Sequence, residues 1–158
     1  PSLVRVEADE VTYNLHIMVR FELERAVFAG DLAVEDLAGA WNEKIKAYLG
    51  IAPPDDLTGV LQDIHWTESF GARFQSYTIG NVTGVALYRK ALEAHPGMHE
   101  DWTRGDFSSL LSWMQANVHA HGTKFKPEEL LRKVTGEGLT ARPYLEHIRA
   151  KYAELYKL

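Results

Sequence analysis

The chain contains no cysteine. This absence excludes disulfides, cysteine-ligated zinc, iron–sulfur clusters and thiol nucleophiles, and it is compatible with a reducing compartment. The chain also lacks any apolar run of the roughly 20 residues that cross a bilayer, and it has no cluster of basic residues. With a formal net charge of -5, it offers no electrostatic footprint for nucleic acid or an anionic membrane. We therefore expect neither of these partners, and we expect a cytoplasmic location.

What the chain does have is an ordinary globular composition. Of its 158 residues, 46% are hydrophobic and 25% are charged. This length and this balance allow a core of useful size and argue against disorder. We therefore expect a single helical unit over residues 1–158. Because the sequence opens at Pro1 directly on a helix-like pattern, we also expect it to be a piece of a longer protein.

Hydrophobic periodicity predicts an all-α protein of about six helices. Apolar residues recur at helical spacing along several stretches that glycine and proline separate. The predicted helices span residues 8–29, 34–49, 74–94, 108–120, 126–135 and 142–157. Gly30, Gly50 and Gly136 each follow one of them, where a glycine is typical of a helix end. We find no convincing pair of strands and no repeat.

A polar stretch between the predicted helices, residues 58–80, is the expected location of a site. It contains Gln62, Asp63, His65 and Tyr77, and it is too polar for a core strand and too irregular for a helix. Loops held between rigid elements are common positions for reactive side chains. The alternative is a long ordered loop whose aromatic residues fill the core, and the pattern alone leaves both interpretations open.

The first predicted helix carries a line of polar residues. Thr12, His16, Arg20 and Glu24 recur every four residues along a helix that is apolar on most other sides. Arg20 and Glu24 are spaced to pair across one turn. Because a buried polar group without a partner is costly, we interpret the line as a paired network that holds helices in register, in preference to a catalytic role.

The histidines do not form a recognisable metal site. A helical zinc protease site needs two histidines four residues apart with a glutamate after the first, but His99-Glu100 is followed by Thr103. The Glu-x-x-His pattern of di-iron bundles is absent as well. His119 and His121 are two residues apart, so we expect them to face solvent at a helix end. We predict no metal ligand in this chain.

The remaining chemistry is polar assistance. His65 and Tyr77 have side chains that can donate hydrogen bonds to a developing oxyanion. Arg5 can clamp a carboxylate with its planar guanidinium group. These are supporting parts of an active site, without a nucleophile or a metal.

Two motifs give the chain a resemblance to a known family. Residues 4–9 read VRVEAD, and residues 59–66 read GVLQDIHW. They are similar to the [I/V]-R-x-x-A-D and G-x-x-Q-D-x-H-W motifs of the carboxypeptidase Taq family, the second at every fixed position. The tail from residue 113 to residue 156 is also similar to the C-terminus of that family, so the resemblance covers essentially the whole chain.

The resemblance implies that this is the C-terminal portion of a larger, mostly helical HExxH zinc carboxypeptidase. Zinc, or cobalt in its place, would be held by residues upstream of this chain, and the isolated chain is expected to be inactive. His65 and Tyr77 would steady the tetrahedral intermediate. Arg5, Gln62 and Asp63 would serve substrate binding, the last two by ordering the loop. The implied partners are a peptide C-terminus, the missing N-terminal part and a second copy in a homodimer.

The chain departs from the family at one place. Members commonly read F-G-Y-F-P-T-Y after the His-Trp pair, whereas residues 70–77 read FGARFQSY. Tyr77 is kept, but the first tyrosine and the proline are replaced. Any role of that first tyrosine is lost, and we expect the subsite near Arg73 and Gln75 to differ.

A second class of function stays open. The chain could be a non-catalytic helical module that binds a partner or dimerises through the surface that the missing part would cover. The intact mass of the source protein separates this hypothesis from the enzyme segment, because only the segment belongs to a longer product.

Overall fold

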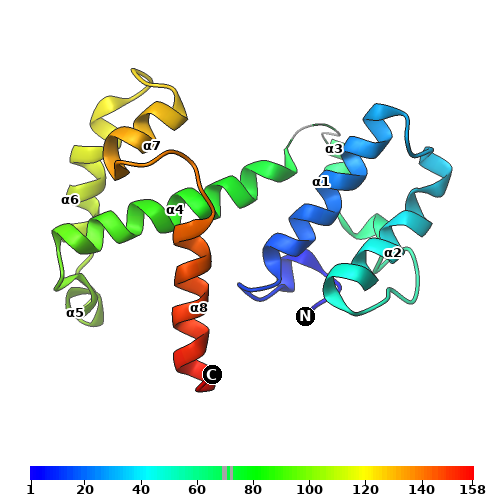
Figure 1. The fold of residues 1–158 in the computed structure, drawn as a ribbon, viewed down its shortest axis with the longest axis horizontal. Helices are drawn as coiled ribbons and strands as arrows, with labels where there is room; N and C mark the ends of the chain where they lie inside the picture. Colours follow the sequence, from blue (N-terminus) through cyan, green and yellow to red (C-terminus); the bar gives the residue numbers. More distant parts are fainter. Residues whose placement is uncertain (69–70, 72) are drawn as a thin grey trace. The chain divides into compact units, whose positions relative to one another are not determined.

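The computed structural model describes residues 1–68, 71 and 73–158. In chain order its helices, of which those labelled η are short 3₁₀ turns, are η1 (Arg5–Glu7), α1 (Tyr13–Ala29), η2 (Val34–Asp36), α2 (Leu37–Leu49), η3 (Val60–Gln62), α3 (His65–Glu68), α4 (Phe74–Ala94), α5 (Met98–Thr103), α6 (Ser108–Asn117), η4 (His119–His121), α7 (Pro127–Thr135) and α8 (Arg142–Tyr156) (Figure 1). No strand occurs among these residues, and the all-α prediction is confirmed.

The chain divides into two compact units. Unit 1 covers Pro1–Ile79 and unit 2 covers Gly80–Leu158, so the boundary falls inside α4. The expectation of one helical unit over residues 1–158 stays a prediction. None of the described helices combines the length and the apolar character that crossing a membrane would require.

The core of unit 1 forms where α1 packs along α2. Both helices place large apolar side chains at helical spacing, so each has a continuous apolar face to bury. The buried residues of this cluster are Val19, Leu23, Trp41, Ile45, Leu49 and Val60. Burying side chains of this size stabilises a fold by about 1.5–3 kcal/mol each. This packing makes α1 and α2 the rigid support for everything that contacts them.

Helix α1 begins later than the sequence predicts. The prediction started at residue 8, whereas the helix starts at Tyr13. The reason is Asp9, whose Oδ1 accepts the backbone N–H groups of Val11 and Thr12 at 3.0 and 2.9 Å. This local turn competes with helical hydrogen bonding over the first residues. The other end is as predicted, because Gly30 closes the helix with a φ of 77°.

The polar line on α1 faces inward. His16 and Arg20 are fully buried and Glu24 is 3% exposed, while the apolar Met18 of the same helix is 44% exposed. The expected pairing within the line is wrong, because Arg20 pairs with Asp63, and no ion pair joins it to Glu24 among the described residues. The helix therefore uses its polar face for a contact across unit 1.

Unit 2 has its own small core. Ala91 of α4, Met98 of α5 and Trp113 of α6 are buried together. Helix α5 was not predicted, because six residues are too few to show a hydrophobic period. The predicted helix 108–120 ends at residue 117, where Val118 has φ and ψ of -121° and -61° and the chain continues into η4.

Candidate functional site

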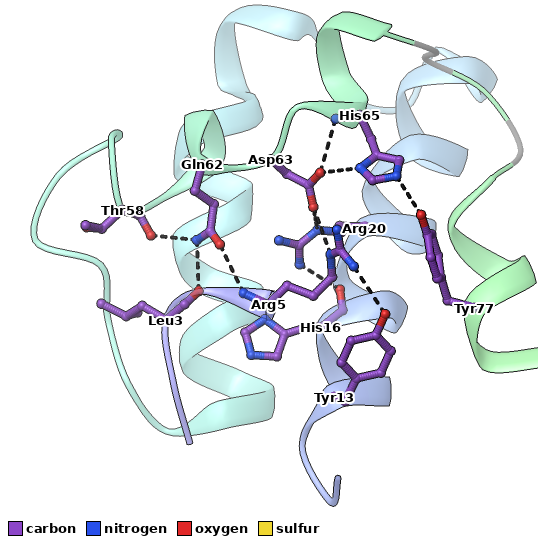
Figure 2. A network of polar contacts seen from close by, with 10 residues as sticks. All are labelled: Leu3, Arg5, Tyr13, His16, Arg20, Thr58, Gln62, Asp63, His65 and Tyr77. Carbon is purple, nitrogen blue, oxygen red and sulfur yellow. Dashed lines mark hydrogen bonds and ion pairs between the residues drawn. The ribbon is translucent and has the colours of Figure 1, made fainter. Parts of the chain in front are cut away.

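The carboxylate of Asp63 is the centre of a buried network in unit 1 (Figure 2). Its Oδ2 atom accepts hydrogen bonds from Nε of Arg5 at 3.1 Å and from Nε of Arg20 at 2.7 Å. Its Oδ1 atom accepts the backbone N–H of His65 at 3.1 Å and lies 2.5 Å from Nδ1 of the same residue. One carboxylate thus joins η1, α1 and the start of α3.

The imidazole of His65 extends the network to Tyr77. Its Nε2 atom lies 2.8 Å from the hydroxyl oxygen of Tyr77, and the two rings meet edge to face, with centroids 5.7 Å apart. Because Nδ1 faces a carboxylate, the proton of a neutral imidazole belongs on Nδ1. Nε2 then accepts the Tyr77 hydroxyl proton, and the three side chains form a Tyr–His–Asp chain.

Charge balance holds Asp63 ionised. Burial by itself would raise the pKa of this carboxyl group, but the His65 backbone N–H, the charge of Arg20 and the side-chain hydrogen bonds outweigh it, and the pKa is held well below its usual range. Burial lowers the pKa of Arg20 to about 10, against the opposing charge of Asp63. Arg20 therefore stays protonated at neutral pH, and the buried pair keeps both charges.

Gln62 fixes the loop that carries Asp63. Its Nε2 group donates to the carbonyl oxygens of Leu3 and Thr58 at 2.8 and 2.7 Å, and its Oε1 accepts the Arg5 backbone N–H at 3.3 Å. The turn before it requires Gly59, because a Cβ there would lie 2.8 Å from a backbone oxygen of Asp55. The side chain of Gln62 thereby joins the second motif, residues 59–66, to the backbone of the first motif at Arg5.

The structure brings the five predicted site residues into one network. Those residues are Arg5, Gln62, Asp63, His65 and Tyr77. Their catalytic and binding roles stay predictions. Position 72, where the family commonly has a tyrosine, lies outside the described residues. The expected change of subsite shape near Arg73 and Gln75 stays a prediction.

Sequence reasoning missed two members of the network. The sequence predicts a pairing of Arg20 within its own helix, and it assigns no polar contact to Tyr13. Tyr13 instead accepts a hydrogen bond from Nη1 of Arg5 at 3.1 Å through its hydroxyl oxygen. The available signal was the arginine itself, since a charged residue on a helix that is apolar on most sides demands a partner from elsewhere in the chain.

His16 is buried beside this network in its neutral form. Its side chain is fully inaccessible, and neither ring nitrogen has a hydrogen-bond partner among the described residues. Burial lowers its pKa from 6.5 to about 4, and the positive charge of Arg20 acts in the same direction. Between pH 6.5 and about 4, His16 therefore stays neutral in the folded chain but binds a proton in the unfolded chain.

We expect the free energy of unfolding to fall as the pH drops from 6.5 to about 4, because only the unfolded His16 gains a proton in that range. Below about 4 both forms are protonated, and the loss stays constant. Urea unfolding across the range measures the slope, and His16→Leu should flatten it. The exposed His119 is the matched control, since His119→Gln should leave the slope unchanged. An unchanged slope in His16→Leu would refute this assignment.

The described residues do not assemble a metal centre. No group of three or more histidine, aspartate or glutamate side chains among them is placed to hold a metal ion. Within the network, Nδ1 of His65 and both oxygens of Asp63 are already engaged by hydrogen bonds. The donor set therefore suits proton and charge control, and the expectation that metal ligands lie elsewhere stays a prediction.

Comparison with known proteins gives matches along the whole chain. Residues 1–152 match the family described as carboxypeptidase Taq (M32) metallopeptidase. The chain is 50% identical over 157 residues to thermostable carboxypeptidase 1 of Thermus thermophilus, covering 99% of this chain and 31% of that protein. It is 42% identical over 158 residues to carboxypeptidase 1 of Bacillus subtilis, covering 100% of this chain and 32% of that protein.

Solved structures agree with the sequence matches. The crystal structure of an M32 carboxypeptidase from Deinococcus radiodurans superposes with a TM-score of 0.94 at 50% identity, covering 99% of this chain and 32% of that one. The chain thus spans about a third of the length of the relatives that it matches.

Proposed function

Because the chain belongs to the carboxypeptidase Taq (M32) metallopeptidase family, we propose that it is the C-terminal segment of a metallocarboxypeptidase that releases single residues from peptide C-termini. In this proposal the segment supplies groups that stabilise the oxyanion and bind the substrate. The observation that carries it is the contact of 2.8 Å between Nε2 of His65 and the hydroxyl of Tyr77, backed by the buried Asp63.

Tyr77 is the donor that meets the substrate, and His65 directs it. Tyr77 is 37% exposed, whereas the His65 side chain is 14% exposed and is held by Asp63. At the tetrahedral intermediate, the Tyr77 O–H leaves its hydrogen bond to Nε2 of His65 and donates instead to the negative oxygen of the reacting carbonyl. Such a donor acts where charge develops in the transition state, so its contribution appears in kcat.

Arg5 is the group that binds the peptide carboxylate. Its Nε and Nη1 atoms are engaged by Asp63 and Tyr13, and no hydrogen-bond partner of Nη2 is present among the described residues. Its guanidinium carbon lies 5.2 Å from the centroid of the Tyr77 ring, so a carboxylate held by Arg5 would lie beside the proposed oxyanion donor. A guanidinium edge presents parallel N–H donors that match a carboxylate.

The metal belongs to the part of the longer protein that precedes this segment. We propose zinc, with cobalt as a substitute, held by residues outside this chain. A bound zinc ion lowers the pKa of its water and polarises a carbonyl. The residues of this chain add the donors at the oxyanion and the positive charge at the substrate carboxylate.

The isolated 158-residue chain is expected to bind no zinc tightly and to hydrolyse no peptide, because it carries the supporting groups alone. Equilibrium dialysis measures zinc binding, and hydrolysis of an N-blocked dipeptide measures peptidase activity. The longer protein is the positive control for both. Stoichiometric zinc in the pure chain, or peptidase activity that a chelator removes, would contradict the proposal.

A surface of unit 2 is compatible with both candidates, the enzyme segment and the non-catalytic interaction module. Helix α8 buries none of its residues, and Leu145, Leu155 and Tyr156 are 51%, 64% and 69% exposed. Apolar groups on one helix suit a partner surface, either the rest of the longer protein or a second copy in a homodimer. The intact mass of the source protein distinguishes the module from the enzyme segment, and the sedimentation of that protein tests the homodimer.

A further inference from the structure

The guanidinium group of Arg20 is held by three separate contacts inside unit 1. Its Nε donates to Asp63 at 2.7 Å, and its Nη1 donates to the backbone carbonyl of His16 at 2.9 Å. Its guanidinium carbon lies 4.6 Å from the centroid of the Trp41 ring, and the side chain is fully buried. Figure 2 shows the two hydrogen bonds. Together with the Trp41 contact, they hold the planar group from three sides.

The two arginines that meet Asp63 are not equivalent. Arg5 is 11% exposed and bonds Asp63 at 3.1 Å, whereas Arg20 is fully buried and bonds it at 2.7 Å. Arg5 also contacts Tyr13 and the Tyr77 ring, which places it on the substrate side of the carboxylate. Arg20, which has no proposed contact with the substrate, is the partner that belongs to Asp63 alone.

Burying the charge of Arg20 at this position costs desolvation free energy. An apolar cluster of α1 and α2 lies next to it, and a leucine or methionine at this position would avoid the desolvation cost of a guanidinium. Its presence therefore indicates a demand on the geometry of Asp63. Asp63 in turn holds Nδ1 of His65 at 2.5 Å.

We propose that Arg20 is a positioning residue that, through Asp63, fixes the ring orientation and the tautomer of His65 and thereby the contact of His65 with Tyr77. The effect of Arg20 on catalysis rests on the proposed function, whereas its effect on the orientation and tautomer of the His65 ring does not. Without Arg20, the Oδ2 atom of Asp63 keeps only the partly exposed guanidinium of Arg5 as a charged partner, so the carboxylate is no longer held in one orientation. The Oδ1 atom that accepts from Nδ1 of His65 is then no longer fixed in place.

The test is ¹⁵N and ¹H NMR of the His65 ring in the 158-residue chain. In the parent we expect one tautomer, with the proton on Nδ1 and a downfield resonance from its short hydrogen bond to Asp63. In Arg20→Gln we expect that resonance to weaken or vanish at neutral pH and both tautomers to be populated. Val19→Ala is the control, because it destabilises the same helix from a fully buried neighbouring position without touching the network.

Arg20→Lys carries the test if Arg20→Gln does not fold. Lysine keeps the charge but lacks the planar fork that bonds Asp63 and the His16 carbonyl together while it lies on Trp41. We expect a weaker Nδ1 resonance there too. A His65 spectrum that matches the parent in either folded variant overturns the proposal, and so does the same spectral change in Val19→Ala.

Activity of the longer protein separates this inference from the proposed function. We expect Arg20→Gln to lower kcat by about 10- to 100-fold with little change in KM, the scale of a displaced catalytic group. If the His65 tautomer is lost and kcat is unchanged, the catalytic role of His65 fails and the positioning role of Arg20 stands. If the His65 spectrum is unchanged, the inference fails whatever kcat does.

Discussion

In the longer protein, Tyr77→Phe is expected to lower kcat by about 10² or more, the scale of losing one oxyanion donor. Phenylalanine keeps the ring that packs edge to face on His65, so the fold should be little disturbed, and only the hydroxyl that lies 2.8 Å from Nε2 is removed. The measurement is steady-state hydrolysis of an N-blocked dipeptide over a range of concentrations up to saturation, which gives kcat and KM separately. A change confined to KM would assign Tyr77 to substrate binding instead.

The hydrogen bond between His65 and Tyr77 leads to a second prediction, which concerns the two residues together. His65→Ala should cost a similar factor, and the double variant should cost little more than the worse single one, because two residues that act as a unit are not additive. Tyr48→Phe is the matched control, since Tyr48 loses a hydroxyl that bonds Glu22 at 2.6 Å on the surface. Additive losses, or an equal loss in Tyr48→Phe, would show that the pair does not act as proposed.

The helices were largely predictable because their signals are local. Helix α4 has the predicted bounds of residues 74–94, and α2 ends at Leu49, directly before Gly50, as predicted. The errors fall where the local signal is short or competes with a side chain. Asp9 delays the start of α1, and α3 spans four residues within a stretch expected to be irregular.

The site was predictable only as far as its motifs reach. Gln62, Asp63 and His65 stand within four residues of one another, so their proximity follows from the sequence. The bond between Arg20 and Asp63 spans 43 positions, and no periodic pattern encodes a contact over that distance. The same applies to Arg5, which meets Asp63 across 58 positions. Packing of α1 against the loop decides both contacts, and packing is a property of the folded chain.

The largest effect on stability is expected from Asp63→Asn in the 158-residue chain. Asparagine keeps the shape of the side chain but removes the negative charge that two arginines share, and one of these arginines is fully buried. Removing one partner of a buried ion pair leaves a charge without compensation, at a cost of about 3–5 kcal/mol. Urea unfolding at neutral pH, followed by circular dichroism and tryptophan fluorescence, measures the difference.

Glu22→Gln is the matched control for this prediction. Glu22 lies on the same helix as Arg20, and its carboxylate also has a cationic partner and a further donor, in Lys44 at 2.5 Å and Tyr48 at 2.6 Å. Its side chain is 36% exposed, however, so water replaces the lost contacts and the cost should stay below about 1 kcal/mol. Equal losses in the two variants would mean that burial of Arg20 does not govern the energy of this network. The contribution of Asp63 should begin to fall when the pH drops into the ordinary carboxylate range, because there only the unfolded chain takes up a proton, and it should be lost completely in stronger acid, where the lowered folded pKa is also passed.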